Sequence, residues 1–525
     1  MSGPVLPAGT GALLRHAVRR DRLLLPLWIL GATSLYWSQA VGVKGLYATE
    51  AELAKAAAPM ENNAALIAMA GPARAIDTYG GQVAWQSTAF GAIVVAFLCA
   101  VTVARHTRGD EESGRFELVL ASAVGRAAPL WAASILAVAA SAATGLLVTL
   151  SLVGSGLPAA GSLACGVGLA FVGLVFTGVA AVAAQLTDGP RAMYGLVGLV
   201  IAVSYALRAA GDVAGNGLSW LSPIGWYQAM WPYSGERWWP LWLFVAAAVG
   251  LAVATSALFA RRDLGRGLWA ARPGPRDGDL TGGSLARRLQ RGGVIGWAIG
   301  LFAVGLTYGA LGDEAGDMIG DSEFSDVFLG SSGDLVDAFH GSALLMQALL
   351  AGGFAISSAL RPRGEEVSGR LELLLSTALP RLRWLGGHVL VTVLGVVLVV
   401  AAGGLGLGVG YAGVTGKSDR LLSFVGPGLS YVPAVLVLVG LAVLLVGWLP
   451  RAATFAWAGL IYAVVVMIFA TLLDFPDLLV DLSPFSHVAQ VPAVDLEVAP
   501  LLSLSAVALA LLAAGFAGFR RRDAG

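Results

Sequence analysis

The sequence has few charged residues for its length. Only 13% of its 525 residues are Asp, Glu, Lys or Arg, about half of the roughly 25% that soluble domains carry. The 33 basic and 33 acidic residues cancel, so no net field attracts a polyanion such as a nucleic acid. These shortages exclude a soluble globular enzyme, a disordered chain and a nucleic-acid-binding protein.

Cysteine and histidine are also scarce. The two cysteines, Cys99 and Cys165, lie inside apolar runs, and the five histidines are scattered along the chain. This pattern offers no disulfide framework and no ligand spacing typical of a metal site. No Ser-His-Asp set is visible either. We therefore expect no catalytic residue and no bound metal in this chain.

A nucleotide-binding loop is missing as well. The nearest string is GVTGKS at Gly413–Ser418, and Tyr411 stands where a phosphate-binding loop requires glycine. We therefore expect no cofactor in this chain, and any ATP and Mg²⁺ that drive its action would be bound by another subunit.

Hydrophobic residues, in contrast, make up 57% of the chain. Windows of about 20 apolar residues suit helices that cross about 30 Å of hydrocarbon. The sequence therefore predicts an all-α integral membrane protein with about twelve transmembrane helices in a lipid bilayer. The predicted spans are 23–43, 84–104, 129–153, 163–185, 192–210, 239–260, 293–311, 342–360, 384–410, 429–449, 453–473 and 500–519.

The distribution of charge predicts the orientation. Most of the 33 basic residues fall on one side of the predicted spans, whereas the loop from Asp313 to Asp337 holds acids and no base. Because basic loops stay in the cytoplasm, we expect a multi-pass protein of the bacterial plasma membrane with both termini cytoplasmic. The polar stretch 264–291, rich in Arg, Gly and Pro, predicts a cytoplasmic linker between a first half, 1–263, and a second half, 292–525.

The two halves repeat each other. Arg108–Arg126 reads RGDEESGRFELVLASAVGR and Arg363–Arg381 reads RGEEVSGRLELLLSTALPR, with identical residues at most positions. Three shorter matches follow in the same order, namely Pro-Arg-Ala at 190 and 450, Leu-Ser-Pro at 221 and 482, and Arg-Arg-Asp at 261 and 521. Each half is therefore predicted to be one six-helix unit. Two such parallel repeats can pack about a pseudo-twofold axis with a path between them.

The repeated segment follows the second helix of each half and is predicted to be an amphipathic coupling helix, over about 108–126 and 363–381. Phe116, Val119, Leu120 and Ala123 have helical spacing, as do Leu371, Leu374, Leu375 and Ala378. Ser113 and Ser368 suit N-caps. One interpretation is an interfacial helix; the matching acids favour a docking surface for a protein partner.

This segment resembles the coupling helix of type-2 ABC exporter permeases, although Gly125 replaces a frequent proline. The Leu-Ser-Pro step and the Phe-x-Arg-Arg-Asp endings at Phe259–Asp263 and Phe519–Asp523 are similar to that family too. Duplicated permeases of this size resemble an actinobacterial group associated with export of polyketide antibiotics and other drugs.

The resemblance implies a mechanism. Each coupling helix would bind a separate ABC ATPase subunit, two copies per chain, and ATP-driven closure would open the path outward for hydrophobic or amphipathic drug-like compounds. The implied docking residues are Glu111, Gly114, Arg115 and Glu117 in the first half and Glu366, Gly369, Arg370 and Glu372 in the second.

Other features leave alternatives open. Gln86 and Gln347 lie in the second helices and are candidates for the substrate path or for a hydrogen bond between helices. The stretch Trp220–Trp242 predicts an aromatic belt or a re-entrant hairpin that seals the exit. The alternative function is a twelve-helix secondary multidrug antiporter, which usually needs ionisable groups within the membrane.

Overall fold

The computed structural model describes residues 7–61, 64–263, 266–269, 282–319, 335–377, 379–470 and 475–522. Nearly all of these residues are helical, and this part of the chain contains no strand. The all-α class is therefore confirmed. Residues 270–281 of the predicted linker, 320–334 of the acidic loop, Ala378 and Asp523 lie outside the described residues.

The chain forms two compact units, Met1–Gly274 and Pro275–Gly525. Within the described residues, eleven helices are long and apolar enough to cross a membrane, which confirms a multi-pass membrane protein. The first unit contains α5 (Tyr79–His106), α8 (Ala128–Gly154), α9 (Ala159–Leu186), α10 (Pro190–Ala214) and α12 (Leu241–Arg261). The second contains α13 (Gly282–Ile319), α15 (Leu335–Ala359), α18 (Arg381–Thr415), α20 (Val432–Trp448), α21 (Ala456–Phe469) and α23 (Val498–Arg521).

The first predicted span forms α2 (Leu24–Leu46), a helix of 23 residues. Polar residues such as Thr33 and Ser34 interrupt the apolar pattern of α2, but their hydroxyls donate to the backbone oxygens of Ile29 and Gly31. At 1.5 Å per residue α2 measures roughly 34 Å, which is enough to cross the hydrocarbon layer. With α2, the first unit also has six long helices.

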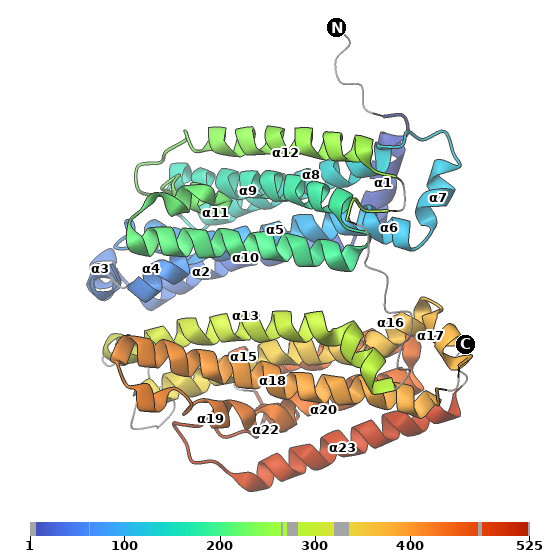
Figure 1. Ribbon diagram of the computed structural model, residues 1–525. Helices are drawn as coiled ribbons and strands as arrows, with labels where there is room; N and C mark the ends of the chain where they lie inside the picture. The colour runs from blue at the N-terminus through green and yellow to red at the C-terminus, as the bar shows by residue number, and fades with distance from the viewer. Residues whose placement is uncertain are drawn as a thin grey trace. The chain divides into compact units, whose positions relative to one another are not determined.

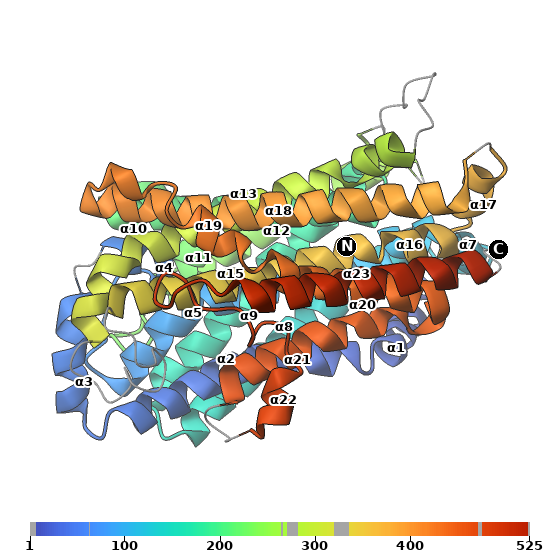
Figure 2. The same cartoon turned by 90° about the horizontal axis from the view of Figure 1, so that it is seen from below.

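The same pairs of helices touch in both units. In the first unit α2 contacts α5 and α8, and α9 contacts α5, α8 and α12 (Figure 1, Figure 2). In the second unit α13 contacts α15 and α18, and α20 contacts α15, α18 and α23. Each unit therefore repeats not only the order of its helices but also their packing.

Small residues allow this close packing. A Cβ atom on Gly145 of α8 would lie 2.2 Å from the backbone oxygen of Gly166 on α9, and one on Gly406 of α18 would lie 2.1 Å from that of Phe302 on α13. The glycine-rich run 403–410 of α18 makes such close contacts at several of its glycines. Close approach lets dispersion stabilise helix pairs in lipid, where the hydrophobic effect cannot.

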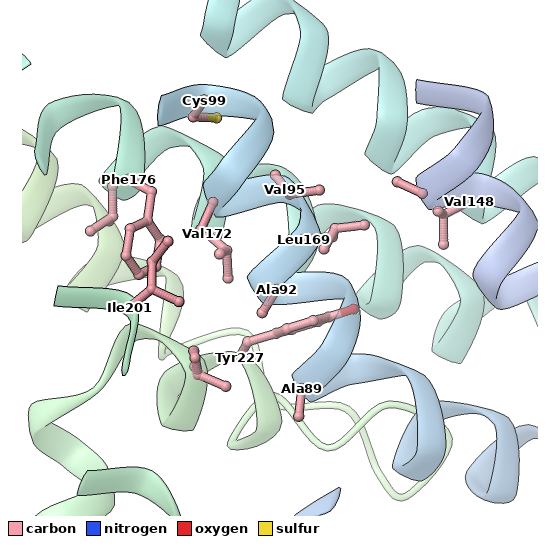
Figure 3. Packing of buried hydrophobic residues seen from close by; sticks show 14 of the residues in the cluster. Ala89, Ala92, Val95, Cys99, Val148, Leu169, Val172, Phe176, Ile201 and Tyr227 are labelled. Carbon is pink, nitrogen blue, oxygen red and sulfur yellow. The ribbon is translucent and has the colours of Figure 1, made fainter. Parts of the chain in front are cut away.

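The core of the first unit lies around α5, α9 and α10. Val172, Phe176 and Ile201 converge there, and the side chain of Tyr227 extends past Ala92 of α5 (Figure 3). Tyr227 is completely buried, and its hydroxyl donates to the backbone oxygen of Cys165 at 2.8 Å. Tyr227 comes from the aromatic stretch, so part of that stretch belongs to the core.

The aromatic stretch is a broken element. Ser222 caps α11 (Pro223–Gln228) by accepting hydrogen bonds from the backbone N–H groups of Ile224 and Gly225, and Pro223 suits the first helical position. The turn after α11 leads to α12. This geometry favours the predicted re-entrant element, while Trp238, Trp239 and Trp242 stay exposed as a belt requires.

Short helices connect the long ones. They are α1 (Thr10–Arg20), α3 (Glu50–Ala57), η1 (Ala58–Met60), α4 (Ala64–Ala70), α6 (Arg108–Glu112), α7 (Arg115–Leu120), η2 (Gly217–Leu221), α16 (Arg361–Val367), α17 (Arg370–Leu375), η3 (Ser418–Arg420), α19 (Val425–Leu429), η4 (Pro450–Phe455) and α22 (Asp477–Asp481). In the first unit α6 and α7 lie at one end of the bundle, and α3 and α4 lie at the other (Figure 1).

Candidate functional site

The repeated segment forms two short helices in each unit, so the bounds predicted for the coupling helices, about 108–126 and about 363–381, are wrong. The first unit has α6 and α7, and the second has α16 and α17. Gly114 and Gly369 separate the helices with left-handed φ values of 72° and 71°. A helix cannot continue through this conformation, which ends many helices at glycine.

The prediction that Ser113 and Ser368 are N-caps is also wrong. Their backbone N–H groups donate to the oxygens of Gly109 and Gly364 at 3.2 and 3.1 Å, which closes the preceding helices. Their hydroxyls also point back, to the backbone oxygens of residues 110 and 365. The serines therefore end α6 and α16, because the left-handed glycine that follows each of them stops the helix.

Each repeated segment begins with a pair of acids, Asp110-Glu111 and Glu365-Glu366. The second acid of each pair lies between two arginines. Glu111 pairs with Arg108 through Oε2 at 2.7 Å and with Arg262 through Oε1. We call Arg108, Glu111 and Arg262 the first ion cluster. The Glu111 side chain is only 8% exposed, so this carboxylate faces the chain's own cations.

The second unit repeats this arrangement. Glu366 accepts two hydrogen bonds from Arg522, at 2.7 and 2.8 Å, and pairs with Arg363 at 3.1 Å. We call Arg363, Glu366 and Arg522 the second ion cluster. Two parallel N–H···O bonds from one guanidinium fix the carboxylate in orientation as well as position.

Each cluster joins two motifs that are far apart in the sequence. Arg262 and Arg522 directly follow α12 and α23, the last long helices of their units. The last arginine of each repeated segment also reaches this point, since Arg126 donates to the backbone oxygen of Arg262 and Arg381 to that of Arg522. The repeated segment is therefore fastened at both ends to the end of the last helix.

The first ion cluster is the more deeply buried one. Arg108 has no exposed surface, and its Nε donates to the backbone oxygen of Ala184. Arg262 donates to the same oxygen at 3.2 Å and to Oε1 of Gln185 at 2.9 Å. These bonds satisfy groups at the C-terminal end of α9, where carbonyls lack helical partners. The first cluster therefore connects α6, α9 and α12.

The first acid of each pair has a different partner in each unit. Asp110 accepts two hydrogen bonds from Arg20 of α1, at 2.7 and 3.0 Å. Its counterpart Glu365 lies 3.5 Å from Nε2 of His388 on α18. The second acid, in contrast, has two equivalent arginine partners in both units.

The outer faces of α7 and α17 match. Arg115, Glu117 and Leu118 are exposed on α7, and Arg370, Glu372 and Leu373 are exposed on α17. Leu118 and Leu373 are 77% and 74% exposed. Phe116 and Leu371, which stand between the exposed arginine and glutamate in the sequence, are buried. Leu371 packs beside Trp384 and Phe519.

The structure thus separates the eight predicted docking residues. Six of them lie on the exposed surface, namely Gly114, Arg115, Glu117, Gly369, Arg370 and Glu372. Glu111 and Glu366 face inward, into the ion clusters. Sequence reasoning missed Leu118 and Leu373, although both repeats place an identical leucine outside the predicted apolar face, which was the available signal.

The two glutamines proposed for the substrate path lie in different units. Gln347 is 4% exposed at the contact of α15 with α18, where a Cβ on Gly403 would lie 2.3 Å from its Oε1. Its amide makes no hydrogen bond to the described residues, so the helix–helix hydrogen bond is not formed there. Gln86 is half-buried. A role of either in a path stays a prediction.

Two six-helix units with the same packing and the same fastened segment define a duplicated, all-helical, multi-pass membrane protein. The family model "Multidrug efflux system permease Rv1217c, C-terminal domain" matches residues 281–520. The multidrug efflux system permease protein Rv1217c of Mycobacterium tuberculosis (strain ATCC 25618 / H37Rv) is 39% identical over 525 residues, covering 98% of this chain and 95% of that protein. The chain belongs to the family of this permease, in agreement with the predicted resemblance to exporter permeases.

Proposed function

We propose that this chain is the membrane subunit of an ATP-driven ABC exporter of hydrophobic or amphipathic, drug-like compounds. Separate ATPase subunits, two per chain, bind ATP and Mg²⁺ and dock on α7 and α17. The proposal is carried by the matching exposed faces of these helices. Two copies of one partner require the same surface twice, and Arg115, Glu117 and Leu118 recur as Arg370, Glu372 and Leu373.

The chemistry of these faces suits a protein groove. An exposed leucine fills an apolar pocket, and the flanking arginine and glutamate fix the orientation through charge. Both faces are cytoplasmic in the proposed orientation, as are both termini, and the membrane is the bacterial plasma membrane.

The ion clusters give the docking faces a mechanical role. A partner that moves α7 pulls on Glu111 and, through Arg262, on the end of α12; Glu366 and Arg522 act in the same way on α23. ATP-driven closure of the two ATPases would thus tilt the last helices and open the path outward. Glu111 and Glu366 serve as internal connections in this mechanism and not as partner contacts.

One observation favours the secondary antiporter as a second candidate. Arg208 on α10 is completely buried and lies 3.7 Å from Asp212, which is 9% exposed. Ionisable groups within a membrane span are a common feature of proton relays. The guanidinium of Arg208, however, donates to the backbone oxygens of Ile67 and Met69. These hydrogen bonds favour a structural role, in which Arg208 joins α10 to α4.

Copurification tests the docking proposal. The chain is expressed with a candidate ABC ATPase subunit from the same organism, and native mass spectrometry is expected to give one permease per two ATPases. The variant Leu118→Glu with Leu373→Glu should lose the ATPase while it still inserts in the membrane. Leu422→Glu is the matched control, because Leu422 is 70% exposed outside the repeated segments. Retention of the ATPase by the double variant would refute docking on these faces.

Transport separates the two candidate functions. Inside-out vesicles that hold the complex should accumulate a hydrophobic fluorescent dye when ATP is added. Vesicles with the permease alone should not accumulate it, either with ATP or with a proton gradient. Accumulation driven by the proton gradient without an ATPase would instead establish the antiporter.

A further inference from the structure

A cavity of about 370 Å³ lies in the first unit, at the end of the bundle opposite the first ion cluster. It is formed by the segment after α4, the start of α5, the end of α10 and the aromatic stretch. Trp85 and Trp220 are among its apolar walls. The indole N–H of Trp85 donates to the backbone oxygen of Gly71 at 2.7 Å, which fixes this wall. The volume lies in the range of small-molecule sites.

Two arginines of this cavity share one aromatic ring. The guanidinium carbons of Arg74 and Arg237 lie 4.0 and 3.0 Å from the ring centroid of Trp231. Stacking on indole stabilises each cation, but it also holds two like charges close together, where they repel. Burial, and then the charge of Arg237, lower the pKa of Arg74 from its ordinary value.

Neither arginine is neutralised by a close acid. Among the described residues no carboxylate lies within 4.0 Å of either guanidinium. Asp212 also lines the cavity, but it accepts a hydrogen bond from Ser219 at 2.6 Å and pairs with Arg208. The two arginines of the cavity therefore have no ion-pair partner within 4.0 Å among the described residues, although the more distant charge of Asp212 raises the pKa of Arg74 in part.

Backbone strain is concentrated at the same place. In the described part of the chain, the non-glycine residues with positive φ are Ala75, Trp231 and Tyr233, at 47°, 54° and 59°. Ala75 follows Arg74, and Trp231 carries the ring that both arginines contact. Such conformations cost about 1–3 kcal/mol each and cluster at binding sites. The strained residue Trp231 thus carries the ring that both arginines contact.

We propose that this cavity binds an amphipathic organic anion, whose carboxylate, sulfonate or phosphate group bridges Arg74 and Arg237 while its apolar body lies against Trp85 and Trp220. An anion removes the repulsion between the two guanidiniums, and the tryptophan walls remove apolar surface from water. Binding needs no ATPase, so it stands or falls independently of the proposed exporter function.

The sequence of the second unit does not repeat this cation pair. The repeat offset of 260 to 261 places Glu497 or Val498 at the position of Arg237, and the loop from Asp313 to Asp337, which leads into the second long helix as the segment of Arg74 does, contains no basic residue. The proposal therefore assigns one anion site per chain.

Calorimetric titration tests the site on the full chain in neutral maltoside detergent. The probe is 1-naphthyl phosphate, and 1-naphthol is the matched compound without the anion. We expect one site per chain for the phosphate, and binding at least about tenfold weaker for the naphthol and for the Arg74→Gln/Arg237→Gln variant, which is a loss of about 1.4 kcal/mol. Equal binding by that variant, or by naphthol, would overturn the proposal.

Two further variants keep the result interpretable. Arg74→Lys/Arg237→Lys retains both charges and should bind more tightly than the glutamine variant, which separates charge from misfolding; equal loss in both variants would refute a charge-based site. Arg420→Gln, an exposed arginine of the second unit, should bind like the natural chain. Competition by phosphatidylglycerol but not by phosphatidylcholine identifies the bound anion as an anionic lipid, and absence of competition indicates a soluble organic anion.

Discussion

The two units are alike at the repeated segment and different at the opposite end. Both segments place the second acid between two arginines, end a helix at a left-handed glycine and expose the same three side-chain types. Within the part of the chain that the structure describes, the strained, doubly cationic cavity lies in the first unit. A partner that binds in two copies requires the same surface in both units, whereas a ligand that binds once requires its site in only one unit.

The ion clusters themselves differ in depth. Glu111 pairs with Arg108 and Arg262, which are 0% and 4% exposed, whereas Arg363 and Arg522 around Glu366 are 27% and 16% exposed. The two equivalent clusters are therefore expected to contribute different amounts to the free energy of unfolding. The burial of the cations sets this contribution, because removing one partner from a buried pair leaves the other charge buried without a counter-ion.

The largest predicted effect follows from this difference. Glu111→Gln leaves two buried guanidiniums without a counter-ion and should lower the free energy of unfolding by about 3–5 kcal/mol. Glu366→Gln should cost only about 1–3 kcal/mol, because its partners reach water. Thermal unfolding of the purified variants in one detergent measures both. Equal losses, or a larger loss in the second unit, would show that burial does not set the strength of the clusters.

A charge exchange sharpens the assignment of the second ion cluster. Glu366→Arg and Arg522→Glu should each destabilise the chain, and the combined variant should recover about 0.5–3 kcal/mol of the loss, as contacting residues do in double-mutant cycles. Combining Glu366→Arg with Arg521→Glu is the control, because Arg521 is exposed and the ion partners of Glu366 are Arg363 and Arg522. Recovery with the control as well would mean that net charge, not the pair, is responsible.

The spans and the family could be predicted from the sequence because they depend on local properties. A run such as 163–185 predicts α9 (Ala159–Leu186) from composition alone, and the glycine-rich run 403–410 predicts close packing. The repeats can be recognised because identical residues recur at one offset along the repeated segment. None of these predictions requires knowledge of which helices touch.

The ion clusters could not be predicted, because Glu111 and Arg262 are 151 residues apart and only tertiary packing brings them together. The charged edge of the segment was interpreted as a partner surface, since unpaired acids in a sequence cannot be distinguished from acids that bind their own chain. The cavity includes Trp231, whose positive φ is not a local preference of aromatic residues.

A smaller effect is expected at the left-handed glycines, and it should be equal in both units. Gly114→Ala and Gly369→Ala should each cost about 1–2 kcal/mol, because a Cβ disfavours this backbone conformation. Space is not the reason, since nothing lies within 4 Å of a Cβ at either position. Gly364→Ala in α16 is the control, with equally open space but a helical backbone. Unequal losses in the free energy of unfolding would indicate that the two turns do not have the same structural role.

The smallest effect on stability is predicted for the residues on which docking depends most. Leu118→Glu and Leu373→Glu should each change the free energy of unfolding by less than about 0.5 kcal/mol, as substitutions on an exposed surface do. On the opposite face of α17, Leu371→Ala removes a side chain that is 1% exposed and should cost about 2–5 kcal/mol. Unfolding measured without the ATPase and copurification measured with it should therefore rank these variants in opposite order. If Leu373→Glu destabilised the isolated chain as much as Leu371→Ala, the exposed leucine would belong to the fold, and the matching faces of the two units would no longer indicate a shared partner.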